Sequence, residues 1–87
     1  MDKIIDFRQQ IDALDTQIMA LLDQRFEITK TIAKEKNKHN LLTLDLSRES
    51  QILEKTKHTI NALEIRVLYT TIFKLSRDLQ DDIRTSR

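Results

Sequence analysis

The 87-residue chain contains no cysteine, no glycine and no proline. Without cysteine there are no disulfides or thiolate metal sites, and nothing indicates an oxidising compartment. Without glycine, tight hairpin turns, Walker-type phosphate loops and dinucleotide-binding fingerprints are all disfavoured. A chain without helix breakers that is rich in Leu, Ile, Lys, Glu, Gln and Arg is expected to be all-helical. Its length indicates one domain, covering residues 1–87.

The chain also lacks long apolar runs and an excess of either charge. Fifteen basic residues stand against 14 acidic ones for a net charge of +1, so we expect no nucleic-acid partner. No segment is long and apolar enough to span a bilayer, and no signal-peptide core is visible, so we expect a soluble cytoplasmic protein without a membrane partner. Two isolated histidines, His39 and His58, are weak grounds for a metal site.

Apolar residues recur at helical spacing in three segments, which cover residues 3–37, 45–58 and 61–83. Either Asp45 or Ser47 can cap the second segment. The sequence therefore predicts three helices, of which the first is much the longest.

The first predicted helix is too long for a compact domain of this size. About 35 helical residues span roughly 52 Å, whereas a compact 87-residue domain has a radius of gyration of about 12 Å. Two shorter helices cover only part of its apolar stripe, which leaves Phe7, Ile11 and Leu14 partly exposed. We therefore predict an intertwined homodimer in which the long helices pack together. The alternative is a coiled-coil hairpin with the same helices and no pocket.

Cationic side chains interrupt the apolar stripe of the first helix. Arg25 occupies a heptad position flanked by Leu21 and Ile28, where a guanidinium is costly to bury unless it is paired. Lys36 follows 11 residues later, about 20° around the helix, so the two share one face. Arg8 points about 100° away from Arg25, so it reaches the same pocket only from a second, antiparallel chain. For Arg25 alone, a register-setting or salt-bridging role is equally consistent.

The two shorter helices add further polar groups to the same side. Arg48 and Glu49 precede apolar residues at the i+4 spacing, and Ser76 and Gln80 fall in the apolar row of the third helix. Each alone has a structural explanation, such as a solvated first turn or a side chain bonded to its own backbone. Together, three helices aim polar groups inward and cations outnumber carboxylates, which indicates an anion-binding site.

The order and spacing of these residues resemble the all-helical (class II) chorismate mutases over nearly the whole chain. The resemblance rests on FRQQIDALDTQIMALLDQR near the N-terminus, on LDLSRES with Asp45, Arg48 and Glu49, and on SRDLQ with Ser76 and Gln80. It implies an all-α, intertwined homodimer of three-helix protomers with two equivalent sites. Each site would take Arg8 from one protomer and its remaining residues from the other.

By this resemblance, the reaction is the Claisen rearrangement of chorismate to prephenate in aromatic amino acid biosynthesis, with no cofactor and no metal. Lys36 and Gln80 would donate to the ether oxygen, Glu49 would accept from the ring hydroxyl, and arginines would hold the carboxylates, since a guanidinium binds carboxylate bidentately. The implied catalytic residues are Lys36, Gln80, Arg25 and Glu49. The implied substrate-binding residues are Arg8, Arg25, Lys36, Asp45, Arg48, Glu49, Ser76 and Gln80.

Two other functions stay open on the sequence alone. An isochorismate pyruvate lyase has the same fold and a related substrate, although the SRES segment resembles the mutases better. A non-catalytic helical adaptor accounts for the helices and the dimer, but not for Arg25, Lys36, Glu49 and Gln80 together. Domains of the resembled family are often fused to, or regulated by, other enzymes of the aromatic pathway, which makes such enzymes candidate partners.

Overall fold

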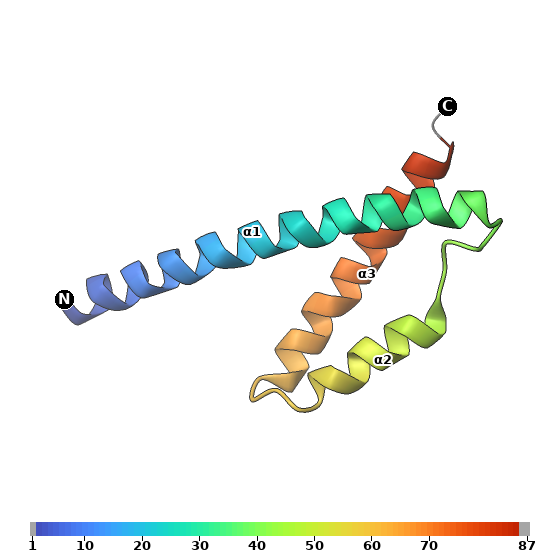
Figure 1. Cartoon of the computed structure of the whole chain (residues 1–87). Coiled ribbons are helices and arrows are strands. Elements are labelled where there is room, and N and C mark those ends of the chain that lie inside the picture. The colour runs from blue at the N-terminus through green and yellow to red at the C-terminus, as the bar shows by residue number, and fades with distance from the viewer. Residues whose placement is uncertain (1, 86–87) are drawn as a thin grey trace.

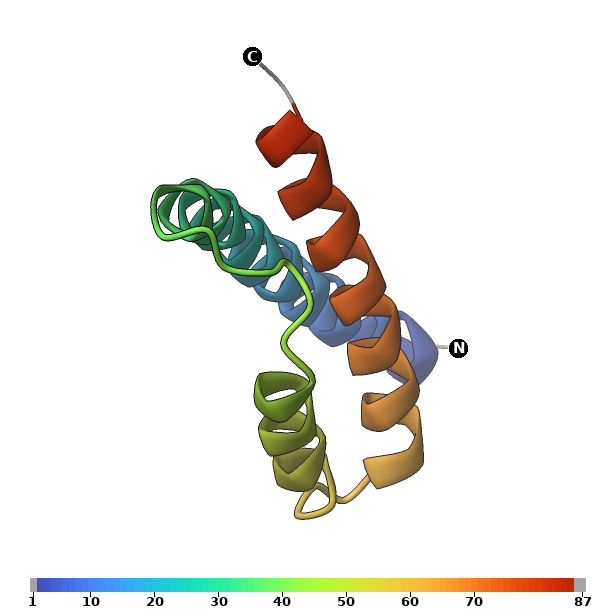
Figure 2. The same ribbon diagram turned by 90° about the vertical axis from the view of Figure 1, so that its right-hand side faces the viewer.

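The computed structural model describes residues 2–85, which form three α-helices and two connections. The helices are α1 (Asp2–Lys38), α2 (Leu46–Thr56) and α3 (Ala62–Thr85), each bound lying within two residues of its predicted position. The predicted all-helical fold is confirmed. α1 is one long rod, α3 crosses its C-terminal half, and α2 runs back beside α3 (Figure 1 and Figure 2).

α1 ends without a glycine because Asn40 adopts the conformation that glycine usually supplies. Its φ of 53° is in the left-handed region, and the amide of Leu41 donates to the carbonyl of Lys36 at 2.9 Å. The amide of Asn40 donates to the carbonyl of Asn37 at 3.3 Å. These two bonds make a Schellman-type C-cap, in which asparagine is the usual substitute for glycine. The turn sends the chain away from α1 and toward α2.

The side chain of Asp45 caps α2. It accepts a hydrogen bond from the backbone amide of Arg48 at 3.0 Å, which satisfies one of the free amides of the first helical turn. Of the two predicted capping residues, Asp45 therefore fills the role. Because α2 begins at this point, Arg48 and Glu49 belong to its first turn.

The helices do not all pack against one another. α3 contacts both α1 and α2, whereas α1 and α2 make no close backbone contact with each other within residues 2–85. The side chains of α1 and α2 therefore approach each other across a space that α3 bounds on one side. None of the described helices combines the length and the hydropathy that a bilayer crossing requires.

The buried core of the single chain is small and partly polar. Among the apolar side chains of residues 2–85, only Ala33, Ile72 and Phe73 are buried. Four polar side chains are buried with them, namely those of Thr29, Thr56, Ser76 and Gln80. Such a core is far below what a domain of this length needs to be stable alone.

The N-terminal half of α1 extends beyond α2 and α3. Phe7, Ile11 and Leu14 are 60%, 54% and 55% exposed, which confirms the partial exposure predicted for them. The chain measures 56 Å along its longest axis, and its radius of gyration is 16.5 Å, well above the value of about 12 Å for a compact domain of this length. An exposed apolar stripe of this length favours a partner that covers it.

Candidate active site

A pocket of ≈ 310 Å³ lies between the three helices and beside the α1–α2 connection. Its apolar lining comes from Ile28, Ile32, Ile52 and Phe73. Its polar lining consists of Arg25, Thr29, Lys36, Thr43, Asp45, Arg48, Glu49, Ser76, Arg77 and Gln80. The coiled-coil hairpin without a pocket is therefore excluded.

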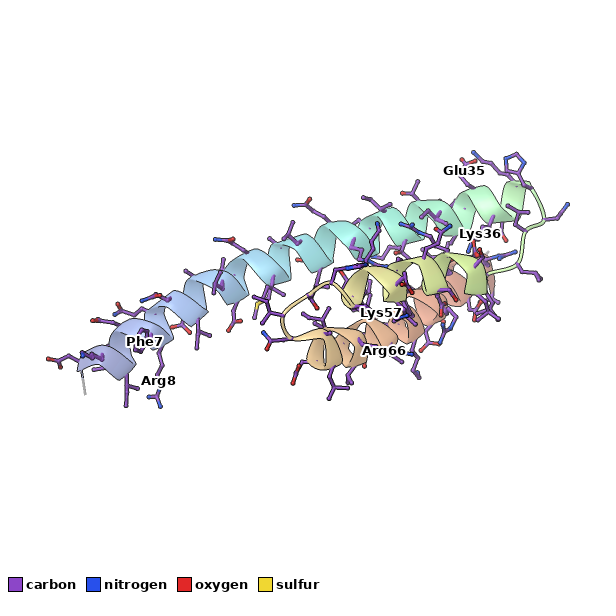
Figure 3. All side chains as sticks on the ribbon, turned by 90° about the horizontal axis from the view of Figure 1, so that it is seen from below. Phe7, Arg8, Glu35, Lys36, Lys57 and Arg66 are labelled. Carbon is purple, nitrogen blue, oxygen red and sulfur yellow. The ribbon has the colours of Figure 1, made fainter. Side chains whose placement is uncertain are left out.

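The pocket brings together every predicted site residue except Arg8. Arg8 lies near the N-terminus of α1, at the end that α2 and α3 do not reach (Figure 3). It precedes Arg25 by 17 residues, which is about 25 Å along a helix. That separation exceeds the reach of any side chain, so the Arg8 of the same chain cannot enter this pocket.

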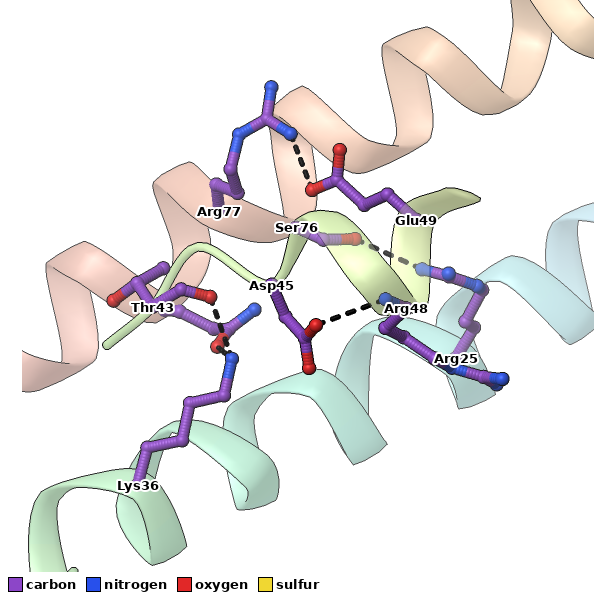
Figure 4. A network of polar contacts seen from close by, with 9 residues as sticks. Arg25, Lys36, Thr43, Asp45, Arg48, Glu49, Ser76 and Arg77 are labelled. Carbon is purple, nitrogen blue, oxygen red and sulfur yellow. Dashed lines mark hydrogen bonds and ion pairs between the residues drawn. The ribbon is translucent and has the colours of Figure 1, made fainter. Parts of the chain in front are cut away.

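The cations of α1 point into the pocket and bind neutral oxygens. Arg25 Nη1 donates to Ser76 Oγ at 3.0 Å. Lys36 Nζ donates to the backbone oxygen of Thr43 at 2.7 Å and to Gln80 Oε1 at 2.9 Å. Figure 4 shows these bonds converging from α1 on α3 and on the α1–α2 connection. The predicted shared face of Arg25 and Lys36 is confirmed, since both line the same pocket.

The bond from Lys36 determines the orientation of the Gln80 amide. An ammonium group only donates, so the end of the amide that faces Lys36 must be its oxygen. The amide NH₂ is left as the donor for another partner. Gln80 is only 8% exposed, so this donor is held in a largely desolvated position and is charge-neutral at any ordinary pH.

The two carboxylates of the pocket do not pair with Arg25, Lys36 or Arg48. Glu49 Oε2 accepts from Arg77 Nη1 at 2.6 Å, and Asp45 accepts from the first turn of α2 as its cap. Within residues 2–85, no ion pair joins Arg25, Lys36 or Arg48 to a carboxylate.

The pocket is therefore electropositive and its cations are available. Four cationic side chains line it against two carboxylates, and Arg25, Lys36 and Arg48 hydrogen-bond through their side chains to neutral groups. Guanidinium groups remain charged at every physiological pH and match carboxylates bidentately. The arrangement suits a small ligand with more than one negative charge.

Nothing in the described part of the chain points to a metal centre. No group of three or more His, Cys, Asp or Glu side chains within residues 2–85 is placed to hold a metal ion. The carboxyl groups with lowered pKa values lie outside the pocket: a hydrogen bond from Lys38 lowers the pKa of Glu35, and one from Lys57 lowers that of Glu54. Both are exposed surface pairs.

Three polar residues of the pocket lining escaped the sequence prediction, namely Thr29, Thr43 and Arg77. Thr43 contributes its backbone oxygen to Lys36, and a backbone acceptor leaves no mark in a sequence. Arg77 directly follows Ser76 in the SRDLQ segment, so its position next to a predicted site residue was the available signal.

A further unpredicted residue, Arg84, lies outside the pocket lining and ties the end of α3 to the α1–α2 connection. Its Nε donates to Asn37 Oδ1 at 2.7 Å, and its Nη1 donates to Thr43 Oγ1 at 2.9 Å. Its Nη2 donates to the backbone oxygen of Leu41. By holding this connection in place, Arg84 also holds the backbone oxygen of Thr43 that accepts the hydrogen bond from Lys36.

Comparison with known proteins identifies relatives of the chain. The family described as "Chorismate mutase type II" matches residues 7–81. The "Bifunctional chorismate mutase/prephenate dehydratase" of Aquifex aeolicus is 36% identical over 55 residues, which are 63% of this chain and 15% of that protein. The "Intracellular chorismate mutase" of Mycolicibacterium smegmatis is 38% identical over 53 residues, 61% of this chain and 51% of that protein. No solved structure matches.

Proposed function

The chain belongs to the type II chorismate mutase family, and from that membership we propose that it catalyses the rearrangement of chorismate to prephenate. The aligned segments span about half of one curated relative and 15% of the other, so the activity is a proposal that rests on the family and on the site together. The observation that carries the proposal is the pocket in which Arg25, Lys36 and Arg48 face a cavity without carboxylate partners.

The arginines are proposed to bind the two carboxylates of chorismate. Arg25 lies on α1 and Arg48 on α2, both line the pocket, and the Arg8 of a second chain would supply a third guanidinium. Holding both carboxylates selects the folded, diaxial conformer in which the reacting atoms are adjacent. Orientation of this kind lowers the barrier because the substrate loses its conformational freedom on binding. Less freedom then remains to be lost on the way to the transition state.

Lys36 and Gln80 are proposed to stabilise the charge that grows on the ether oxygen as the C–O bond breaks. The ammonium of Lys36 has three donors, of which two are bound to Thr43 and Gln80. The third donor and the NH₂ of Gln80 are available to the substrate. Donors fixed in advance around a developing negative charge stabilise the transition state more than the ground state.

Glu49 and Ser76 complete the proposed set. Glu49 has one oxygen bound to Arg77, and its other oxygen can accept from the ring hydroxyl of the substrate, with the backbone of Asp45 nearby. Ser76 accepts from Arg25 through its hydroxyl oxygen, and its own O–H proton is free to donate to a substrate carboxylate.

We also propose that the working form is a homodimer with two composite sites. One arrangement accounts for two observations, namely the exposed stripe of α1 and the absence of the chain's own Arg8 from its pocket. In an antiparallel arrangement, the N-terminal half of one α1 covers the partner's pocket and brings Arg8 to it. The names of the relatives further suggest an intracellular protein and an aromatic-pathway enzyme, such as a prephenate-processing one, as a partner.

The direct test is to add purified protein to chorismate, follow the loss of its absorbance, and identify the product. Prephenate supports the proposal, whereas pyruvate identifies a lyase. Unchanged chorismate contradicts both enzymatic functions and leaves the adaptor. Lys34→Ala is the matched control for removal of a cation, because Lys34 is an exposed residue of α1 outside the pocket.

The pH profile tests the role of Gln80. An amide donates without being protonated, so the wild-type rate should stay nearly constant between about pH 6 and pH 8. In Gln80→Glu, the carboxylate beside Lys36 is ionised at neutral pH and cannot donate. We expect its kcat at pH 7.5 to be lower than that of the wild type by about tenfold or more, and to rise as the pH falls toward 5.

Gln80→Ala is the control for this profile, because it has no donor at any pH and should be slow throughout. A Gln80→Glu enzyme that is as fast as the wild type at pH 7.5 contradicts the proposed donation. A wild-type rate that rises only at acidic pH also contradicts the proposed donation.

A further inference from the structure

We infer that Arg77 is a positioning residue that keeps Glu49 bound and thereby leaves the other cations of the pocket free for a dicarboxylate. The inference rests on the proposed function and deepens it. Arg77 lies on α3 and Glu49 on α2, and Nη1 and Oε2 are 2.6 Å apart. Both residues line the pocket, and Figure 4 shows their side chains meeting.

A carboxylate inside an anion site competes with the substrate. Glu49 lines the same pocket as Arg25 and Arg48, and its side chain is only 20% exposed. Without a partner of its own, it would be free to act as a counter-ion for either guanidinium. A substrate carboxylate would then have to displace it, and every such displacement weakens binding.

The other polar contacts of the pocket show that Glu49 is the carboxylate in need of this control. Asp45 is bound to the first turn of α2 as its cap. Arg25 and Lys36 are held by the neutral oxygens of Ser76, Thr43 and Gln80. Such acceptors orient a cation without cancelling its charge. The bond from Arg77 therefore keeps the Glu49 carboxylate from pairing with the other cations of the pocket.

The same bond sets the direction of the carboxylate. With Oε2 bound to Arg77, Oε1 is the oxygen that can accept a hydroxyl proton from a ligand. Arg77 does not need to contact the ligand for either effect. A structural tether between α2 and α3 would use the same bond, so the experiment must separate affinity from stability.

The test compares KM for chorismate and the dissociation constant for cis-cyclohexane-1,3-dicarboxylate, an unreactive ring with two carboxylates. Arg77→Met keeps an apolar stem and removes the charge. We expect both constants to rise about tenfold, as befits the loss of a charge-assisted hydrogen bond, and kcat to fall by a smaller factor, because the Glu49 carboxylate is no longer held in one direction. Arg77→Lys should restore both constants to within about threefold of the wild type, since an ammonium also pairs with Glu49.

The decisive control is the double variant Glu49→Gln/Arg77→Met. With a neutral amide at position 49 there is no competing charge, so Arg77→Met should raise neither constant further in that background. If it does, Arg77 acts on the ligand directly and the inference is wrong. Unchanged constants in the single variant also overturn it, as does a loss of stability with unchanged affinity, which is the mark of a tether. If Arg77→Met does not fold, Arg77→Gln is measured in its place.

The dicarboxylate separates this inference from the proposed function. A wild-type protein that binds it without converting chorismate contradicts the mutase activity, yet still tests Arg77 through the dissociation constants. A wild-type protein that does not bind it at millimolar concentration shows that the pocket cations are not available, and the inference falls with that result.

Discussion

Replacing Arg25 by alanine is expected to lower kcat/KM for chorismate by about 10³-fold while the protein stays folded. Arg25 is the cation of α1 that occupies a heptad position, half-buried beside the pocket. Removing the guanidinium that is proposed to bind a substrate carboxylate would leave that carboxylate unpaired in the pocket. The loss should appear in both kcat and KM, because the reactive conformer is then neither bound nor oriented.

The stability of the same variant should change little. Arg25 donates to the hydroxyl of Ser76 and to no carboxylate within residues 2–85. Its removal therefore leaves no buried charge without a partner. The lost hydrogen bond has a charged donor but a neutral acceptor at a half-exposed site, and we expect it to be worth about 1.5 kcal/mol, which is partly offset because the guanidinium no longer has to be desolvated. We expect the free energy of unfolding in urea to fall by no more than about that amount, or to rise.

The two measurements together distinguish an enzyme from an adaptor. If Arg25 were a structural residue of a non-catalytic dimer, alanine would destabilise the protein and no chorismate activity would exist to be lost. Arg25→Lys is an informative companion, because it keeps the charge and loses the fork, and it should fall between the wild type and alanine. Lys34→Ala should match the wild type in both measurements.

The helices and most of the pocket could be predicted because both follow from periodicity within single segments. Arg25 and Lys36 face the same way through the 100° step of one helix, and the structure places both in one pocket. Arg48 and Glu49 are fixed by the start of α2, which Asp45 sets as the cap. None of these placements depends on how the helices cross.

The contacts between helices could not be predicted in the same way. The pairing of Arg77 with Glu49 and the bonds of Arg84 to the α1–α2 connection join residues 28 and more than 40 positions apart. They depend on the angle between α2 and α3 and on the path of residues 39–45. That path begins with the left-handed conformation of Asn40, which an asparagine permits but does not require.

The small core and the composite site have the same physical origin. Each buried polar residue of the pocket, such as Ser76 and Gln80, occupies a position that an apolar side chain would otherwise fill. The single chain thus gives up part of its own core to build the site. In the proposed dimer, burying the exposed stripe of α1 against a second chain would compensate for that loss, and the same packing would deliver Arg8.

The proposed dimer is tested most directly by mixing two variants that are each inactive alone. Their mixed dimer is expected to regain catalytic activity. Arg8→Ala should lower kcat/KM by about 10²–10³-fold, since it removes a guanidinium from the site. Arg25→Ala inactivates the other half of the same site. When equal amounts are unfolded and refolded together, about half of the dimers combine the two variants.

In such a mixed dimer, one site lacks both arginines and the other has both. Random pairing therefore leaves about a quarter of all sites intact, and the mixture should recover about a quarter of the wild-type kcat. The control mixes Arg25→Ala with Lys36→Ala. Both of these residues come from the same chain in each site, so every site keeps a defect and no activity should return. If Arg8 acted within its own chain, its mixture would stay as inactive as the control, because no site could then escape both substitutions.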